Sequence, residues 1–425
     1  MHRRRAEEGQ VIVIIALSIV VIIGMTALAI DGSRYYADRR ESQAAADSAA
    51  LAGAGAAAEY IKNYSPGEFY CGSALGAEAS TKAILAAINN AAKDGVTLSA
   101  DPGAQTHVDV TCDNDGFRRY LDIHVQVTSA TELSFGRVIT SQPLVGQVEA
   151  VTRVYPQENL AFGNAIASLS QNCDDGGIYL DGGSAITIYD GGVFSNSCLE
   201  GKGNISLVVS DAKIQYLDTF TMTGAAYFSP APIGASEPLP EIEIAPPDCS
   251  SLTVKGAVQT SANVTPGIYP NMNLNAGSVV NMAPGLYCLD GDFKINGDAT
   301  INGTNVTIYM RAGQIDLTGN AQINLSAPNC TTSICGVPPA IRGILFFVDP
   351  SNTNPVKFSG TATSSFMGTI YAPNSEIVVT GTDDIVTIQT QMIGQKVSVT
   401  GNVKIELNLD GAELYQMPSS IELRK

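Results

Sequence analysis

The stretch VIVIIALSIVVIIGMTALAI, from Val11 to Ile30, decides how the rest of the chain is organised. Its twenty positions hold no charged residue. An α-helix rises about 1.5 Å per residue, so this stretch spans about 30 Å, the thickness of the hydrocarbon core of a bilayer. We therefore expect one membrane-spanning helix that begins at Val11 and ends at Ile30, behind a cytoplasmic tail of residues 1–10.

The orientation of this span rests on arginines and cysteines. Arg3 to Arg5 precede the span, while Arg34, Arg39 and Arg40 follow it, so the positive charges that favour the cytoplasmic side nearly balance. All eight cysteines follow the span: Cys71, Cys112, Cys173, Cys198, Cys249, Cys288, Cys330 and Cys335. An even number of cysteines favours disulfides in an oxidising compartment. We expect a cytoplasmic N-terminus and an extracytoplasmic bulk in a single-pass protein of the cell membrane.

A cleaved secretory signal is the alternative interpretation of the same stretch. Ala27-Leu28-Ala29 has the small-residue form of a cleavage site. However, the apolar run exceeds the roughly 7 to 15 residues of a signal peptide, and helix-favouring sequence continues beyond the supposed cut. We expect a retained anchor, and both interpretations place the remainder of the chain outside the cytoplasm.

Composition indicates a turn-rich β protein beyond the anchor. The 425 residues include 41 glycines and 20 prolines, no tryptophan, and only 15% charged residues. The formal charge is −17, and an acidic exterior of this kind repels nucleic acid. Eight cysteines permit 105 connectivities, so the pairings that we expect rest on nearness alone. They are Cys71 with Cys112, Cys173 with Cys198, Cys249 with Cys288, and Cys330 with Cys335.

An alanine-rich segment continues from the span. Because alanine is the best helix former, we expect the membrane helix to run on as a stalk over residues 31–62. The small side chains from Ala44 to Ala58 allow close packing on the protein's own domain or on partner proteins. A simple solvated stalk is the remaining alternative.

The first sixty residues resemble a known family. A basic start, Gly9-Gln10 leading the span, Asp31 and Arg34 at its exit, and Gln43 with Asp47 in the alanine-rich run are similar to TadG-type proteins of the tight-adherence (Tad/Flp) pilus system. The resemblance covers about 50 residues. It implies a membrane-anchored component of pilus assembly, or of a related envelope apparatus, that acts through protein contacts and has no catalytic site. We also expect no cofactor and no metal.

Two features differ from relatives of that family. Gly9-Gln10 places Ile14 where a processed prepilin would carry glutamate, which argues against cleavage by a prepilin peptidase. The chain also has no Asp-x-Ser-x-Ser motif of a von Willebrand factor A metal site. These differences argue against a processed pilin and against metal-dependent adhesion.

A small pilin-like α+β domain is expected over residues 63–157. Pro66-Gly67 breaks the first helix, and apolar residues at three- and four-residue steps predict a second helix from Ala77 to Lys93. Alternating segments around His107 and His124 predict half-buried strands. Neither histidine has a Cys or Glu at the spacing of a metal ligand. We therefore interpret both as residues of the solvent face or of the core, and we expect no metal site.

A repeat dominates residues 161–417. A strand, a turn glycine and a second strand recur every 20 to 22 residues, at glycines 183, 203, 224, 256, 277, 297, 319, 360, 381 and 401, with one long and one double step. A fixed period near twenty predicts a parallel β-solenoid, or β-helix, of roughly ten coils. The proline-rich segment 229–248 interrupts the period and is expected to form an extended excursion or a seam between two blocks.

An enzyme is the first alternative function, since many β-solenoids act on polysaccharides. The best acidic pairs are Asp174-Asp175 and Asp383-Asp384, but the basic residues Arg311 and Arg342 do not recur in register with them. Adjacent aspartates are common in turns. We therefore expect no catalytic residue.

A surface adhesin that binds glycan is the stronger alternative. Residues 365–372, with the coils after them, are loosely similar to ice-binding β-solenoid modules over about 40 residues, although the Thr-x-Thr pairs at 361–363 and 380–382 are isolated. The expected architecture is a membrane-anchored α+β domain followed by an all-β solenoid, with membrane and pilus or envelope proteins as partners and surface glycan as the alternative ligand.

Overall fold

The computed structural model describes residues 8–64, 68–138, 140–317, 320–329, 339–360, 365–409 and 414–424. The chain forms two compact units, and each is described by itself. The first contains residues 1–157 and 418–425, and the second contains residues 158–417. The second unit is thus inserted between the last two strands of the first.

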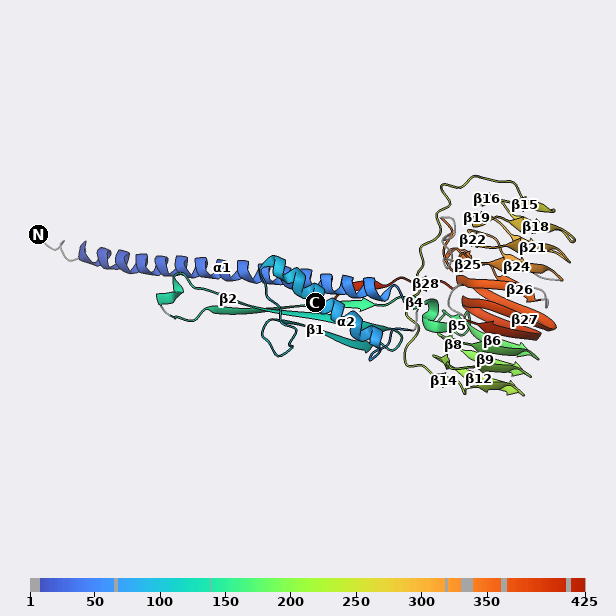
Figure 1. Cartoon of the computed structure of the whole chain (residues 1–425), viewed down its shortest axis with the longest axis horizontal. Helices are drawn as coiled ribbons and strands as arrows, with labels where there is room; N and C mark the ends of the chain where they lie inside the picture. The colour runs from blue at the N-terminus through green and yellow to red at the C-terminus, as the bar shows by residue number, and fades with distance from the viewer. Residues whose placement is uncertain are drawn as a thin grey trace, which may run out of the picture. The chain divides into compact units, whose positions relative to one another are not determined.

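The first unit combines two long helices with a four-stranded antiparallel sheet (Figure 1). Helix α1 runs from Glu8 to Ile61 without a break, and α2 runs from Ala74 to Ala91. The strand order is β1-β2-β3-β29. The strands are β1 (His107–Asn114), β2 (Arg119–Thr131), β3 (Leu144–Tyr155) and β29 (Ser420–Leu423). The C-terminal strand was not expected, because the predicted solenoid ended at residue 417 and left the last eight residues unassigned.

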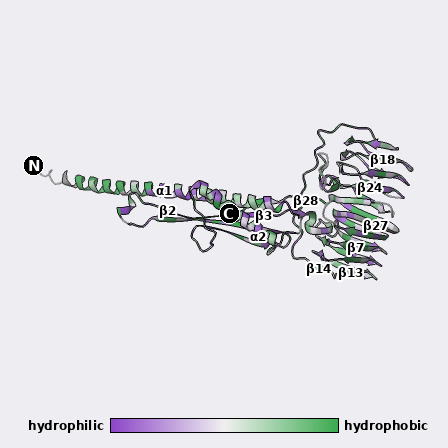
Figure 2. Ribbon diagram, viewed as in Figure 1, coloured by the Kyte–Doolittle hydropathy of each residue, from purple (hydrophilic) through white to green (hydrophobic). Residues whose placement is uncertain are grey.

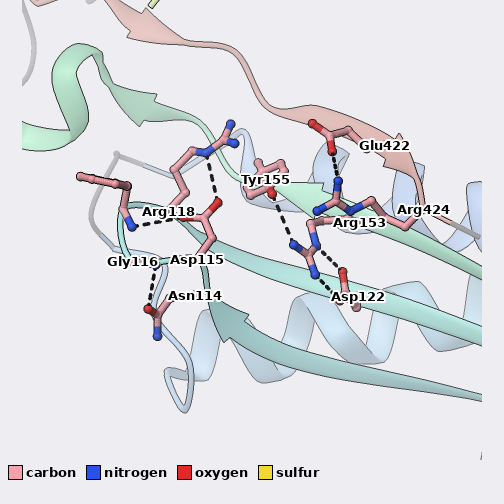
Figure 3. Close-up of polar contacts among 10 residues, drawn as sticks. Asn114, Asp115, Gly116, Arg118, Asp122, Arg153, Tyr155, Glu422 and Arg424 are labelled. Carbon is pink, nitrogen blue, oxygen red and sulfur yellow. Dashed lines mark hydrogen bonds and ion pairs between the residues drawn. The ribbon is translucent and has the colours of Figure 1, made fainter. Parts of the chain in front are cut away.

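Side chains on one face of this sheet form the core with the helices. Leu121, Ile123 and Val125 of β2 are fully buried there and alternate with half-buried polar residues of the outer face. Figure 3 shows the outer face, where Arg153 of β3 holds Asp122 of β2 through two hydrogen bonds of 2.7 Å. The hydrogen bonds with Asp122 raise the pKa of the Arg153 guanidinium.

The second unit is a parallel β-solenoid of about ten turns. Each coil contributes short strands that pair in parallel with the equivalent strands of the neighbouring coils. The first block contains β5 (Asn164–Ser168), β6 (Gly177–Gly182), β7 (Ala185–Tyr189), β8 (Gly192–Ser195), β9 (Leu199–Gly203), β10 (Ser206–Val209), β11 (Ile214–Tyr216), β12 (Phe220–Gly224), β13 (Tyr227–Ser229) and β14 (Ile233–Gly234).

The second block continues the same construction. It contains β15 (Ala262–Val264), β16 (Gly267–Tyr269), β17 (Met272–Leu274), β18 (Val279–Met282), β19 (Gly285–Leu289), β20 (Phe293–Ile295), β21 (Thr300–Gly303), β22 (Val306–Met310), β23 (Ile315–Leu317), β24 (Gln322–Ser326), β25 (Ile344–Val348), β26 (Val356–Gly360) and β27 (Ser365–Asn408). The short strands β4 (Glu158–Asn159) and β28 (Gln416–Met417) pair where the chain enters and leaves this unit. Three short 3-10 helices complete the elements: Ala92–Asp94, Gly136–Val138 and Leu160–Gly163.

The coils do not stack in the order of the sequence. The last coil of the second block pairs with the first coil of the first block, because Val399 of β27 lies beside Leu180 of β6 and Ile405 lies beside Ile186 of β7. The chain therefore enters the solenoid in the middle, builds the coils to one end, crosses to the other end, and returns to the middle (Figure 1).

The segment from 235 to 261, which we call the return strap, makes this crossing along the side of the coils. Its Leu239 amide donates to Asn196 Oδ1 at 2.8 Å, and the Tyr371 hydroxyl donates to the carbonyl of Ile242 at 2.8 Å. A disulfide joins Cys249 of the return strap to Cys288 of β19. The proline-rich excursion is therefore a return connection that is fixed along its length.

A ladder of glycines marks one corner of the coils. Gly401 pairs with Gly182, Gly182 with Gly203, and Gly203 with Gly224. A Cβ on Gly182 would lie 2.3 Å from the carbonyl oxygen of Gly401, so only glycine allows this approach. The expected turn position at Gly183 was wrong by one residue, since Gly182 has the left-handed backbone and occupies the ladder.

Candidate functional site

The first half of α1 exposes its apolar side chains. Within residues 11–30, the large side chains range from 39% exposed at Ile30 to 70% exposed at Ile12. Figure 2 shows that most residues at this end of α1 are hydrophobic. Among the described residues, this is the one helix long and apolar enough to cross a membrane by length and composition. A single-pass anchor is consistent with it.

The second half of α1 buries its alanines. Ala46, Ala50, Ala54 and Ala57 are fully buried against α2 and the sheet. Gly53 lies at the tightest point, where an added Cβ would lie 2.9 Å from the Ala83 carbonyl oxygen of α2. From residue 42 on, the expected stalk packs on its own domain, which is one of the two packing modes expected for its small side chains, because these allow a close approach.

The motif residues Gln43 and Asp47 fix this half of α1 to the sheet. The Gln43 side-chain amide donates to Asp47 Oδ1 at 2.8 Å and to the Glu149 carbonyl of β3 at 3.0 Å. Gln43 therefore joins helix to strand, and Asp47 orients it. The surroundings of Gly9 and of the Gln10 side chain are not among those that the structure describes.

Asp31 and Arg34 hold the tip of the hairpin that joins β2 to β3. The Asp31 carboxylate accepts hydrogen bonds from three consecutive amides, at 2.8 Å from Ser134, 3.1 Å from Phe135 and 2.6 Å from Gly136. Arg34 donates to the Ser134 hydroxyl. Burial raises the pKa of Asp31, but the three amides and Arg34 outweigh it and leave the pKa below its usual value.

The hairpin tip presents apolar side chains beside the end of the span. Phe135 and Val138 are 49% and 93% exposed, and Leu144 and Val145 at the start of β3 are also exposed. Asp31, which directly follows the apolar stretch, places this tip next to Ile30. Lone exposed apolar residues need no explanation, but a cluster beside a membrane span extends its apolar surface.

Three disulfides in the described residues each join two cysteines that follow one another in the order of cysteines along the chain. They are Cys71–Cys112 in the first unit, and Cys173–Cys198 and Cys249–Cys288 in the solenoid. The remaining pair that we expected, Cys330 with Cys335, lies outside the described residues, as do Arg3 to Arg5.

The structure describes the side chains of one of the two acidic pairs considered for catalysis, Asp174-Asp175. Asp175 contacts Asn172 at 3.4 Å within one turn, and Arg311 pairs with Asp290 of the neighbouring coil. The side chains of Asp383 and Asp384 lie outside the described residues. A cavity of about 540 Å³ lies elsewhere, between the return strap and the coils, and Glu241, Tyr371 and Gln395 line it.

One cluster joins residues that the sequence analysis did not connect. Asp109 of β1 lies between His107 and His124, with its Oδ1 atom 3.3 Å from His107 Nε2 and 3.0 Å from His124 Nδ1. Asp109 and His124 are direct partners in the antiparallel register. The signal was the His-x-Asp pattern of β1, which puts both side chains on one face.

Two family models match this chain, one on the N-terminal helix and one in the solenoid. Residues 9–57 match the family model Tad, described as "Putative Flp pilus-assembly TadE/G-like". Residues 253–412 match a "Domain of unknown function (DUF7305)", which coincides with the end of the return strap and the second block of coils. No curated protein and no solved structure matches the chain. The chain therefore carries a TadE/G-like Tad domain on its N-terminal helix, followed by a β-solenoid.

Proposed function

We propose that this protein is a membrane-anchored structural component of Tad/Flp pilus assembly that acts by protein–protein contacts. The observation that carries the proposal is the position of the Tad domain, which covers the whole apolar span and the buried alanine face. Because α2 and the sheet already cover that face, partner proteins contact the span itself. Gly24, with no other atom within 4 Å of an added Cβ, offers a close-packing position there.

The solenoid lies outside the cytoplasm in this proposal. Three disulfides support an oxidising compartment for both units. The solenoid, with its return strap tied to the coils by hydrogen bonds and a disulfide, acts as a rigid surface element. The hairpin tip with Phe135 and Val138 rests on the lipid interface and sets the depth of the anchor.

A photo-crosslinking experiment tests this assignment. A photoreactive residue replaces Leu17 in the span in one variant, and Met222 on an exposed strand of the solenoid in a second. We expect the Leu17 variant to form adducts with membrane proteins of the pilus-assembly machinery in cells that build the pilus. Adducts with lipid alone at Leu17 would contradict the assembly role.

The same pair of variants tests the alternative function. An adhesin would present its ligand-binding face on the solenoid, whose coils stack side chains in rows; Met222 lies in one such row, where β12 stacks on β9. Saturable binding of cells or glycans by the full-length protein, together with glycan adducts at Met222, would support adhesion. Proteolytic accessibility of the solenoid on intact cells tests the orientation.

A further inference from the structure

The cluster of His107, Asp109 and His124 lies on the outer face of the four-stranded sheet. His107 and Asp109 are two residues apart on β1, and His124 faces Asp109 from β2. Val108 and Val125, their neighbours along the strands, point into the core on the opposite face. The strand periodicity therefore brings all three polar side chains together, although they come from two separate segments.

Distances within the cluster suit a metal ion. Asp109 Oδ1 lies 3.3 Å from His107 Nε2 and 3.0 Å from His124 Nδ1, and one ligand atom of each residue lies within 4.8 Å of the others. Zinc binds imidazole nitrogen and carboxylate oxygen at about 2.0 to 2.2 Å in tetrahedral sites, which sets neighbouring ligand atoms about 3.3 Å apart. The two short distances match that spacing.

The orientation of His107 leaves a lone pair directed at Asp109. Its Nδ1 atom lies 2.7 Å from the Ala104 carbonyl oxygen, an atom that only accepts, so Nδ1 carries a proton. In the neutral ring Nε2 then has no proton, and it faces a carboxylate oxygen at 3.3 Å. Two electron-rich atoms at that distance repel each other unless a proton or a metal cation lies between them. A backbone carbonyl on the far ring nitrogen is also the usual support of a metal-bound histidine.

We propose that His107 Nε2, Asp109 Oδ1 and His124 Nδ1 bind one divalent transition-metal ion, with zinc as the best fit, and that water completes the coordination. His107 is only 7% exposed, so the ion would be held at the edge of the core. β1 is an edge strand, and the Cys71–Cys112 disulfide already ties down its far end. The metal would fasten the near end of β1 to β2.

Zinc binding by the full-length protein in detergent tests the proposal. After chelation and dialysis, calorimetric titration with Zn²⁺ should show one equivalent bound, and cobalt(II) should give the visible absorption of a four-coordinate site. Asp109→Asn and His124→Gln each replace one of the three ligands and should weaken binding by about 100-fold or more, since loss of a supporting partner alone costs about 10- to 100-fold. Thr111→Ala, on the same strand and face, should bind as the unaltered protein does.

Two results would overturn the proposal. One is zinc binding that survives both ligand substitutions, which would assign the metal to other groups, including His2. The other is an unaltered protein that takes up no zinc at all, which would make the cluster a histidine–carboxylate hydrogen-bond network. Circular dichroism of each variant separates loss of the metal from loss of the fold.

Discussion

The two halves of helix α1 differ in which side chains they expose. From residue 11 to residue 30, the large side chains of valine, isoleucine and leucine point away from the protein. Beyond residue 42, most of the small alanines point inward and are buried. One uninterrupted helix carries both patterns. The backbone is the same in both halves, so the side chains alone assign the first half to lipid and the second to protein.

The difference shows what drives packing in each environment. In lipid, large apolar side chains are already solvated, and burying them against protein gains little. Beyond the membrane, the helix must exclude water, and alanine lets α2 and the sheet approach closely enough to do so. Charges placed in the first half and larger side chains placed in the second therefore test which half contacts lipid and which contacts protein.

Two charges in the first half should have the largest effect. Lysines at Ile19 and Ile23 lie at the centre of the apolar stretch, where each charge costs roughly 2.5 to 3.5 kcal/mol of insertion free energy. The double variant should move largely out of the membrane fraction, because the total offsets most of the gain from the remaining apolar residues. The measurement is fractionation of membranes followed by carbonate extraction.

A control with the same charges placed in the second half sharpens this test. Ala44→Lys with Leu51→Lys alters two exposed positions of α1, so the protein should stay in the membrane. If the two double variants distribute alike, residues 11–30 are not the anchor.

Two glycines two residues apart should respond in opposite directions. In Gly53→Ala the added methyl would lie 2.9 Å from the Ala83 carbonyl oxygen and 3.1 Å from Ile123, so α1 must shift away from α2. We expect it to lower the free energy of unfolding by about 1 to 3 kcal/mol. Gly55→Ala meets no atom within 4 Å and should raise it by about 0.5 to 1 kcal/mol through helix propensity. Thermal unfolding in detergent measures both, and equal signs would refute the close contact at Gly53.

Much of the architecture could be predicted because its signals are local. The apolar stretch, the alanine run and the twenty-residue period each depend on side chains near one another in sequence. The order of the coils could not be predicted, since Ile405 lies beside Ile186 through a pairing of coils that are far apart in the sequence. Any stacking order satisfies the same inward-facing pattern, so the repeat alone does not choose among them.

The candidate site was predicted less completely. Asp31, Arg34, Gln43 and Asp47 were singled out through a resemblance, and their contacts with the hairpin tip and β3 follow only from the tertiary structure. Asp109 was missed because the link between it and His124 depends on the register of β1 against β2. A hairpin register is set by its turn and its hydrophobic pattern, and no single residue displays it.

Asp31 lies where the two halves of α1 meet, and its loss should have a local effect. Asp31→Asn removes the charge and one of the two acceptor oxygens that hold the amides of Ser134, Phe135 and Gly136. Hydrogen exchange at these amides should become roughly tenfold faster or more, since charge-assisted bonds are the stronger kind. Asp47→Asn, in the same helix but away from the tip, should leave their exchange unchanged. Equal loosening in both variants would mean that the tip is not held by Asp31.

Lowering the pH should weaken the contact between Asp31 and the hairpin tip, with a smaller effect than the Asp31→Asn substitution. The pKa of Asp31 is lowered in the folded protein, so its contribution to stability is complete above the ordinary aspartate pKa of about 4. That contribution falls as the pH drops through the folded pKa, because the protonated carboxyl accepts amide hydrogen bonds poorly. Amide chemical shifts at residues 134–136 should therefore change together below about pH 4, and the change should be absent in Asp31→Asn. A transition centred above pH 4 would mean that burial outweighs the three amides, and that the junction between the halves is held by apolar contacts instead.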